Sequence, residues 1–205
     1  MILNSKIRTI KWENNVSKMI DQTILPNTYS YVEVKTIDKM YENIKNMVVR
    51  GAPAIGIAGA HGVVLGAYEL EREENDILKY KNKLIDRSNW LKTSRPTAVN
   101  LKWAIDKQIE IIKKFEGCNI QRLIDELVEN VLKLENDDIL INQRIGKNGA
   151  KLVNKLSAGI LTHCNAGALA TVGYGTALGV IRSAFANDKT IKDDANETRP
   201  RQQGA

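Results

Sequence analysis

Short runs of alternating hydrophobic and polar residues occupy the first part of the chain. The segments "KIRTIKW", "SKMIDQTILP" and "YSYVEVKT" predict three short β-strands within the first 36 residues. From Thr36 onward the hydrophobic spacing changes to three and four, with Met40, Tyr41, Ile44 and Met47 on one face. This spacing predicts an α-helix, and Thr36 is placed to cap its N-terminus.

A second helix is predicted in "VVRGAPAIGIAGAHGVVLGAYELE", which places Pro53 in its first turn. Glycines recur along one face of this helix at Gly56, Gly59, Gly62 and Gly66. A glycine costs a helix about 1 kcal/mol relative to alanine. We therefore expect another backbone or a ligand to approach this face closely.

The remaining pattern predicts further helices and then one buried strand. The segment "SRPTA" is expected to open a Pro-initiated helix. Two more helices are expected, one through residues 120–134 and one through residues 141–156. After them "GILTHCN" predicts a short buried strand and "ALGVIRSAF" the end of a helix. Helix, strand and helix in this order indicate the beginning of a parallel α/β unit.

The composition is that of a globular protein. The chain has 205 residues, of which 43% are hydrophobic and 26% charged, with a net charge of +6. Basic residues alternate with acidic ones, as in "EREENDILKYKNKLIDR", which favours a solvated surface over a nucleic-acid interface. A modest positive field still helps an anionic substrate to approach.

Cysteine and histidine usage limits the possible chemistry. Cys118 and Cys164 lie far apart, and His61 and His163 are the only histidines, so neither a disulfide framework nor a metal site is expected. Polar residues interrupt the longest uncharged stretch, and no secretory signal pattern is present, so we expect no membrane segment. These features favour a reduced, cytoplasmic setting.

Cys164 is the first candidate for chemistry. It stands at the carboxyl end of the predicted buried strand, where open α/β sheets place their ligand crevice, and small residues follow it. The N–H groups of a helix expected soon afterwards favour an anion or a thiolate. The alternative is a small buried hydrophobic residue. Gly173, Gly175 and Gly179 only superficially match a dinucleotide fingerprint, because they come too late after the strand.

Arg50 and Arg95 are the second candidates. Each precedes a predicted Pro-started helix, in "RGAP" and "SRPTA". A guanidinium beside unpaired helix N–H groups is suited to holding a phosphate. A single arginine in this position is more often part of the surface, but two beside small-residue turns indicate an anion site.

These motifs carry a resemblance to a known family. The segments "VVRGAPAIGIAGAHG", "TSRPTAVNLKWAI", "ILTHCNAGALATVGYGTALGVIRSA" and "ETRPRQQGA" resemble the methylthioribose-1-phosphate isomerase family. Its superfamily includes ribose-1,5-bisphosphate isomerases and regulatory subunits of eukaryotic initiation factor 2B. The resemblance implies an α/β fold with a mostly helical N-terminal domain over residues 1–125. Residues 126–205 then form a linking helix and the beginning of a Rossmann-like domain.

The resemblance also implies an activity, conversion of 5-methylthioribose 1-phosphate to 5-methylthioribulose 1-phosphate in methionine salvage. It implies Cys164 as the catalytic cysteine, no cofactor or metal, and a homodimer. The implied substrate-binding residues are Arg50, Gly51, Ala52, Arg95 and Gln203. The alternatives are an isomerase of 5-deoxyribose 1-phosphate or ribose 1,5-bisphosphate, or a regulatory subunit, which lacks the "THCNAG" cysteine motif. We expect no nucleic-acid or membrane partner.

Two features depart from the family pattern. Its proton-transferring aspartate and an Asn-Lys pair that binds substrate belong to a later motif, so we expect the isolated 205 residues to be inactive. The segment "TIKDDANETRP" stands where a buried apolar strand is expected, yet it contains Asp193 and Asp194. Burying an unpaired carboxylate costs several kcal/mol, so we do not expect this strand to form.

Overall fold

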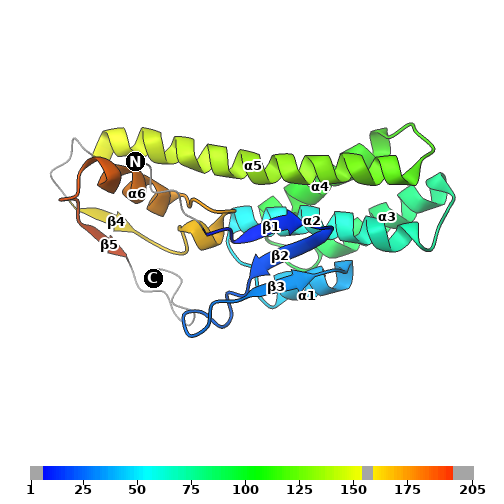
Figure 1. The fold of residues 1–205 in the computed structure, drawn as a ribbon, viewed down its shortest axis with the longest axis horizontal. Helices are drawn as coiled ribbons and strands as arrows, with labels where there is room; N and C mark the ends of the chain where they lie inside the picture. Colours follow the sequence, from blue (N-terminus) through cyan, green and yellow to red (C-terminus); the bar gives the residue numbers. More distant parts are fainter. Residues whose placement is uncertain (1–6, 154–158, 196–205) are drawn as a thin grey trace. The chain divides into compact units, whose positions relative to one another are not determined.

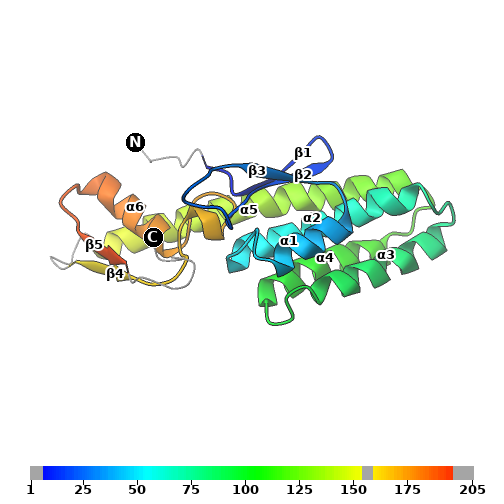
Figure 2. The same ribbon diagram turned by 90° about the horizontal axis from the view of Figure 1, so that it is seen from below.

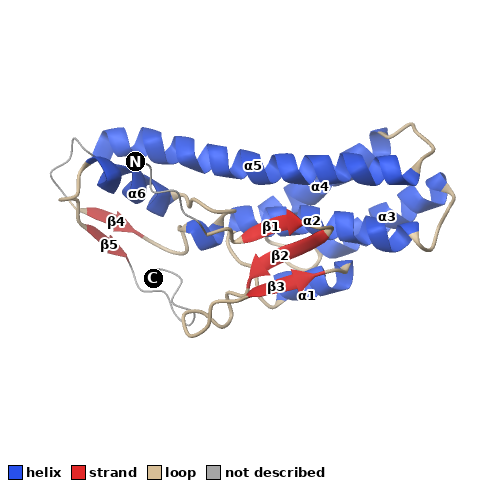
Figure 3. Ribbon diagram, viewed as in Figure 1, coloured by secondary structure: helices blue, strands red, loops and turns tan. Residues whose placement is uncertain are grey.

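The computed structural model describes residues 7–153 and 159–195. The chain divides into two compact units (Figure 1). The N-terminal unit comprises Ile10–Glu135, and the C-terminal unit comprises Asn136–Ala205 together with the residues up to Thr9. Helices make up most of the described chain, and each unit contains one small sheet (Figure 3). This is the expected fold class.

Three short strands form the sheet of the N-terminal unit. They are β1 (Ile10–Glu13), β2 (Val16–Ile20) and β3 (Tyr31–Val34), paired antiparallel in that order. Ile10 lies opposite Met19, and Met19 lies opposite Val32. Ile10 and Met19 are fully buried, whereas Lys18 makes ion pairs with Glu13 and Glu33. The three strands expected from alternation are confirmed.

Four helices complete most of the N-terminal unit. They are α1 (Ile37–Lys45), α2 (Ala52–Glu71), α3 (Ile77–Lys92) and α4 (Val99–Lys114). The cap of α1 is as predicted, since the Lys39 N–H donates to Thr36 Oγ1 at 3.1 Å. Helix α2 is buried along nearly all of its length, and Figure 2 shows the strands on one side of it and α3 and α4 on the other.

The glycine face of α2 is a contact surface for other helices. A Cβ atom on Gly59 would lie 2.6 Å from Leu101 Cδ1 of α4. One on Gly56 would lie 3.0 Å from the carbonyl oxygen of Asn100. Both distances are shorter than ordinary van der Waals contacts, so these glycines allow α4 to pack against α2. The close approach that the sequence predicts is therefore a helix–helix contact at these positions.

Two predicted helix boundaries are wrong. Pro96 does not start α4, which begins at Val99, because Arg95 and Pro96 lie in a turn closed by the Ala98 N–H donating to the Arg95 carbonyl (3.0 Å). The two helices expected over residues 120–156 are a single helix, α5 (Ile120–Val153), as far as the structure describes them. The first half buries Leu123, Ile124, Leu127 and Val131, whereas Ile141, Ile145 and Leu152, on which the second helix was predicted, are exposed.

A buried polar chain links β2, α2 and α5 in the N-terminal unit. Ser17 Oγ lies 2.8 Å from His61 Nδ1, and His61 Nε2 lies 2.9 Å from Glu135 Oε1. The same carboxylate oxygen accepts a hydrogen bond from the Trp12 N–H at 2.6 Å. Ser17 and His61 are fully buried, so His61 acts as an internal polar link rather than a surface group.

The C-terminal unit contains a two-stranded parallel sheet and two helical segments. These elements are β4 (Ile160–Thr162), the 3₁₀ turn η1 (Ala168–Ala170), α6 (Ala177–Asn187) and β5 (Asp193–Ala195). Ile160 pairs with Asp193 and Leu161 with Asp194. The C-terminal part of α5 packs on α6 through glycines, since a Cβ on Gly149 would lie 2.6 Å from Val180 Cγ1.

Two expectations about this sheet are wrong. The strand β4 is not buried along its length, because Leu161 is 69% exposed and β4 pairs only with β5 among the described residues. The strand that was not expected at "TIKDDANETRP" forms over Asp193–Ala195. Asp193 and Asp194 are exposed, so their carboxylates remain hydrated and the strand does not incur the expected burial cost.

Candidate functional site

The N-terminal end of α2 holds Arg50, Gly51 and Ala52. Gly51 is the N-cap residue, with φ of 99°, a left-handed conformation that favours glycine. The cap provides no side-chain hydrogen bond to the first turn, which leaves its N–H groups available to an anion. Ala52 is exposed at this end.

Arg50 is held firmly beside this helix end. It is 8% exposed, and its Nε donates to Gln22 Oε1 at 3.3 Å. The Gln22 side chain in turn donates to the Arg50 carbonyl at 3.5 Å, and the Gln22 N–H donates to the Val48 carbonyl at 2.9 Å. The guanidinium is therefore positioned by the loop after β2, which local sequence around Arg50 does not reveal.

The structure places the turn containing Arg95 at the same end of the helical unit. Gly56 meets Asn100 and Gly59 meets Leu101 and Ile105, so α2 and α4 run in the same direction. Their N-terminal ends therefore lie together, one following Arg50 and the other following Arg95. Arg95 is half-buried. Two arginines and two helix N-termini at one end form an environment suited to a phosphate.

Cys164 lies two residues beyond β4, in the C-terminal unit. Its side chain is exposed and takes no part in a disulfide. Its φ of 68° is a left-handed conformation, which costs a residue with a side chain about 1–2 kcal/mol. Such backbone strain concentrates at functional sites. The alternative of a small buried hydrophobic residue is thus wrong for Cys164.

The loop after Cys164 is fixed by backbone hydrogen bonds. The Thr176 and Leu178 N–H groups both donate to the Ala166 carbonyl, at 2.9 and 3.2 Å. The helix predicted soon after Cys164 begins only at Ala177, but these bonds bring its start back to Ala166. A Cβ on Gly175 would lie 2.7 Å from the Gly167 carbonyl carbon, so position 175 must be a glycine for the start of α6 to lie against the loop at residues 166–167.

Two distant residues fix the middle of the same loop. The Thr9 N–H donates to the Val172 carbonyl at 2.9 Å, and Thr9 Oγ1 donates to the Ala168 carbonyl at 2.7 Å. From α5, Asp138 Oδ2 accepts a hydrogen bond from the Val172 N–H at 2.7 Å. Burial raises the pKa of Asp138, while hydrogen bonds from Val172 and Asn142 oppose the rise. Sequence analysis missed both residues, because nothing local distinguishes them from ordinary polar positions.

Two buried polar groups beside Cys164 are without hydrogen-bond partners in the described part of the chain. They are Thr162 Oγ1 and Asn165 Nδ2. Buried polar atoms are nearly always paired, so such groups at the end of a strand are candidates for ligand contacts. The sequence analysis treated Asn165 only as a small residue. Its position immediately after the cysteine was the signal available.

The remaining sequence-based candidates are placed as follows. Gln203 lies outside the described residues. Arg50, Gly51, Ala52 and Arg95 belong to the N-terminal unit and Cys164 to the C-terminal unit.

Within residues 7–153 and 159–195, no group of three His, Cys, Asp or Glu side chains is arranged to hold a metal ion. No helix there is both long enough and apolar enough to span a membrane.

Comparison with known proteins places this arrangement in a family. The model of the initiation factor 2 subunit family matches residues 48–205, and the chain belongs to this family. Among curated relatives, the methylthioribose-1-phosphate isomerase of Petrotoga mobilis is 49% identical over 98% of this chain and 58% of its own length. The enzyme of the same name from Thermotoga maritima is 46% identical over 98% of this chain and 56% of its own length.

Two solved structures share the fold. The 5-methylthioribose 1-phosphate isomerase from Pyrococcus horikoshii has a TM-score of 0.86 and 35% identity, covering 98% of this chain and 55% of that chain. The translation initiation factor eIF-2B subunit delta from A. fulgidus has a TM-score of 0.83 and 39% identity, covering 98% and 57%. The chain thus spans little more than half the length of the proteins it resembles.

Proposed function

We propose that this chain is part of a methylthioribose-1-phosphate isomerase. The reaction is an aldose–ketose isomerisation of 5-methylthioribose 1-phosphate to 5-methylthioribulose 1-phosphate, a step of methionine salvage. The observation that carries the proposal is identity of 46–49% to two enzymes of that name across nearly the whole chain. The strained, exposed Cys164 and the arginine-flanked helix ends support it. We further propose a cytoplasmic homodimer.

The substrate determines what the site must do. Phosphate on the anomeric oxygen prevents the sugar ring from opening as a free aldose does. The enzyme must therefore assist ring opening and then move hydrogen from C2 to C1, which requires a group that holds and transfers a proton. We assign this part to Cys164, as a proton carrier or as the group that stabilises the transition state. No cofactor is required for this chemistry.

The remaining residues bind the substrate in this proposal. Arg50 and Arg95 provide positive charge for the phosphate, and Gly51 and Ala52 provide backbone N–H groups at the start of α2. Gln203 is assigned to substrate binding on the family motif alone. Asn165 joins the set because its buried Nδ2 is without a partner among the described residues and Cys164 precedes it directly. Its amide is suited to hydrogen-bonding an oxygen of the reacting sugar.

The test is an isomerase assay of the full-length protein with three sugar phosphates. We expect turnover of 5-methylthioribose 1-phosphate to exceed that of 5-deoxyribose 1-phosphate and ribose 1,5-bisphosphate. Equal turnover of all three contradicts the substrate assignment. No turnover of any contradicts the enzyme assignment and favours a subunit like the eIF-2B protein from A. fulgidus.

A variant tests the anion site. Arg95→Gln removes one charge-assisted contact to phosphate, worth about 1.5–3 kcal/mol. We expect KM to rise about tenfold to hundredfold. The matched control is Arg72→Gln, because Arg72 caps the opposite end of α2. Steady-state kinetics that leave KM unchanged in Arg95→Gln, or raise it equally in Arg72→Gln, contradict a phosphate contact at Arg95.

A further inference from the structure

An open groove lies within the C-terminal unit, between α6 and the C-terminal part of α5. Its volume is about 910 Å³, at the upper end of the range of small-molecule sites. It is lined by Asp137, Leu140, Gln143, Arg144, Lys147, Ala150 and Lys151 of α5, and by Tyr174, Arg182, Ser183, Ala186 and Asn187. We call it the α5–α6 groove. It contains none of the residues assigned to the isomerase site.

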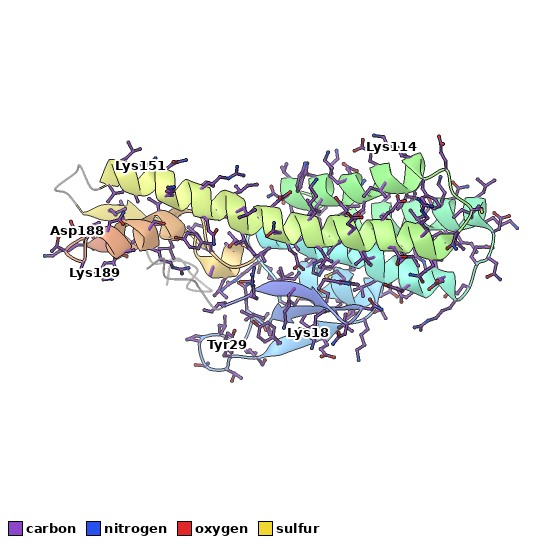
Figure 4. All side chains as sticks on the ribbon, turned by 45° about the horizontal axis from the view of Figure 1, so that its top comes forward. Lys18, Tyr29, Lys114, Lys151, Asp188 and Lys189 are labelled. Carbon is purple, nitrogen blue, oxygen red and sulfur yellow. The ribbon has the colours of Figure 1, made fainter. Side chains whose placement is uncertain are left out.

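Positive charge dominates the walls of this groove. Arg144, Lys147 and Lys151 follow one another at spacings of three and four residues, which places them on one face of α5. The helical rise separates their first and last positions by about 10 Å along the axis. Arg182 faces them from α6, and Asp137 is the single carboxylate in the lining. Lys151 projects from the last turns of α5 (Figure 4).

These cations differ from several basic residues elsewhere on the chain that form ion pairs. Lys39, Lys83 and Lys114 each pair with a glutamate at 2.7–2.9 Å. None of the four groove cations forms an ion pair with a carboxylate in the part of the chain that the structure describes. Lys151 contacts only the neighbouring Asn148 at 3.5 Å. Their charge is therefore available to a ligand.

Contacts with Tyr174 hold the Arg182 side chain in place. Its guanidinium lies 5.3 Å from the centre of the Tyr174 ring, and Nη1 donates to the Tyr174 carbonyl at 3.1 Å. Tyr174 is fixed in turn, because its hydroxyl lies 2.7 Å from Ser183 Oγ. Gly146 allows this close packing, since a Cβ there would lie 2.5 Å from Ser183 Oγ. An ordered cation loses little freedom on binding a ligand, which favours affinity.

We propose that the α5–α6 groove binds a small molecule carrying a diphosphate or triphosphate group. A single phosphate reaches one or two of the cations, whereas a chain of phosphates spans the row on α5 and meets Arg182. Leu140, Ala150 and Tyr174 provide an apolar surface for the rest of the molecule. The groove is bounded by two helices and holds about 910 Å³, which suits a small molecule better than a nucleic-acid strand.

Isothermal titration calorimetry of the full-length protein with inorganic tripolyphosphate tests this proposal. We expect saturable binding that is tighter than that of inorganic phosphate. Arg144→Gln combined with Lys147→Gln is expected to weaken it by about tenfold or more, because two charge-assisted contacts are lost. Both residues are exposed, so thermal melting is expected to show an intact fold.

Three controls distinguish binding in the groove from binding elsewhere on the protein. Lys113→Gln combined with Lys133→Gln removes the same charge from exposed positions outside the groove and is expected to change affinity less than about twofold. Arg95→Gln is also expected to leave the affinity for tripolyphosphate unchanged. A single-stranded oligonucleotide is expected not to compete with tripolyphosphate. Absence of saturable binding, equal weakening in both double variants, loss in Arg95→Gln, or displacement by the oligonucleotide each overturns the proposal.

Discussion

The two units treat their buried polar groups differently. In the N-terminal unit, Gln108 Nε2 donates to the Leu127 carbonyl at 3.1 Å and Gln108 Oε1 accepts from Asn130. In the C-terminal unit, Thr162 Oγ1 and Asn165 Nδ2 are buried beside Cys164 without partners among the described residues. An unmade hydrogen bond costs about 1–3 kcal/mol. The difference is one of surroundings: the two groups of the C-terminal unit lie beside Cys164, whereas His61 Nε2 of the N-terminal unit, which also makes no hydrogen bond among the described residues, lies 2.9 Å from Glu135 Oε1.

The two units also place their candidate residues differently. Arg50 and Gly51 stand at the start of a 20-residue helix that is buried along most of its length. Cys164 has a strained conformation on a loop that donates a hydrogen bond to Asp138 and accepts others from Thr9 and the start of α6. The proposed binding residues thus lie at a helix end, whereas the proposed catalytic residue lies on a loop, and both Gly51 and Cys164 have a positive φ. Variants at Cys164, His61 and Asp138 test how the two units differ.

The largest effect is expected from the two cysteines, one in each unit. Cys164→Ser in the full-length protein keeps the size of the side chain but replaces a thiol with a much weaker acid. We expect kcat to fall by about a hundredfold or more, as is typical when a proton-transferring group is lost. Steady-state kinetics of both variants and the wild type measure the change in kcat. Cys118→Ser, which changes the exposed cysteine of the N-terminal unit, is the control and should leave kcat unchanged. Similar kcat values in both variants would remove Cys164 from the mechanism.

A smaller effect, on stability, is expected from the two histidines. His61→Leu breaks the link between Ser17 and Glu135 and leaves the buried Ser17 hydroxyl without that contact. We expect a loss of about 1–3 kcal/mol in the free energy of unfolding. His163→Leu makes the same chemical change at an exposed position and should alter stability by less than about 0.5 kcal/mol. Urea denaturation gives both values, and equal losses would show that the buried chain does not stabilise the N-terminal unit.

The smallest effect is a pH dependence at Asp138. Because burial raises its pKa, the folded chain keeps this proton at pH values where the unfolded chain has released it. Its contribution to stability is therefore present below the pKa of an unfolded aspartate, about 3.9, and is lost as pH rises to the folded value. Asp138→Asn stays neutral and can still accept from the Val172 N–H.

The measurement is the urea midpoint of both proteins from about pH 4 to pH 7. We expect Asp138→Asn to gain stability relative to wild type as pH rises across this interval. Asp137→Asn, at the neighbouring position on the open groove, is the control and should follow wild type. A constant difference between Asp138→Asn and wild type would show that Asp138 does not titrate differently in the folded chain.

The sequence by itself determined the local elements of this protein. Alternation along residues 6–36 predicted β1, β2 and β3, and the oxygen of Thr36 caps α1 as expected. Both follow from contacts within a few residues, where side-chain period and hydrogen-bonding capacity decide the conformation. The candidate residues Arg50, Gly51 and Cys164 also came from motifs, and their roles stay predictions.

Only the tertiary structure decided how these pieces come together. The parallel packing of α2 and α4 brings the turns at Arg50 and Arg95 to one end, and it depends on which helix fills the glycine face. The bonds from Thr9 and Asp138 to the loop after Cys164 join positions far apart in the chain. The exposure of Asp193 and Asp194 likewise depends on where β5 lies. Such contacts leave no local pattern, because many pairings of the same elements satisfy the same hydrophobic periodicity.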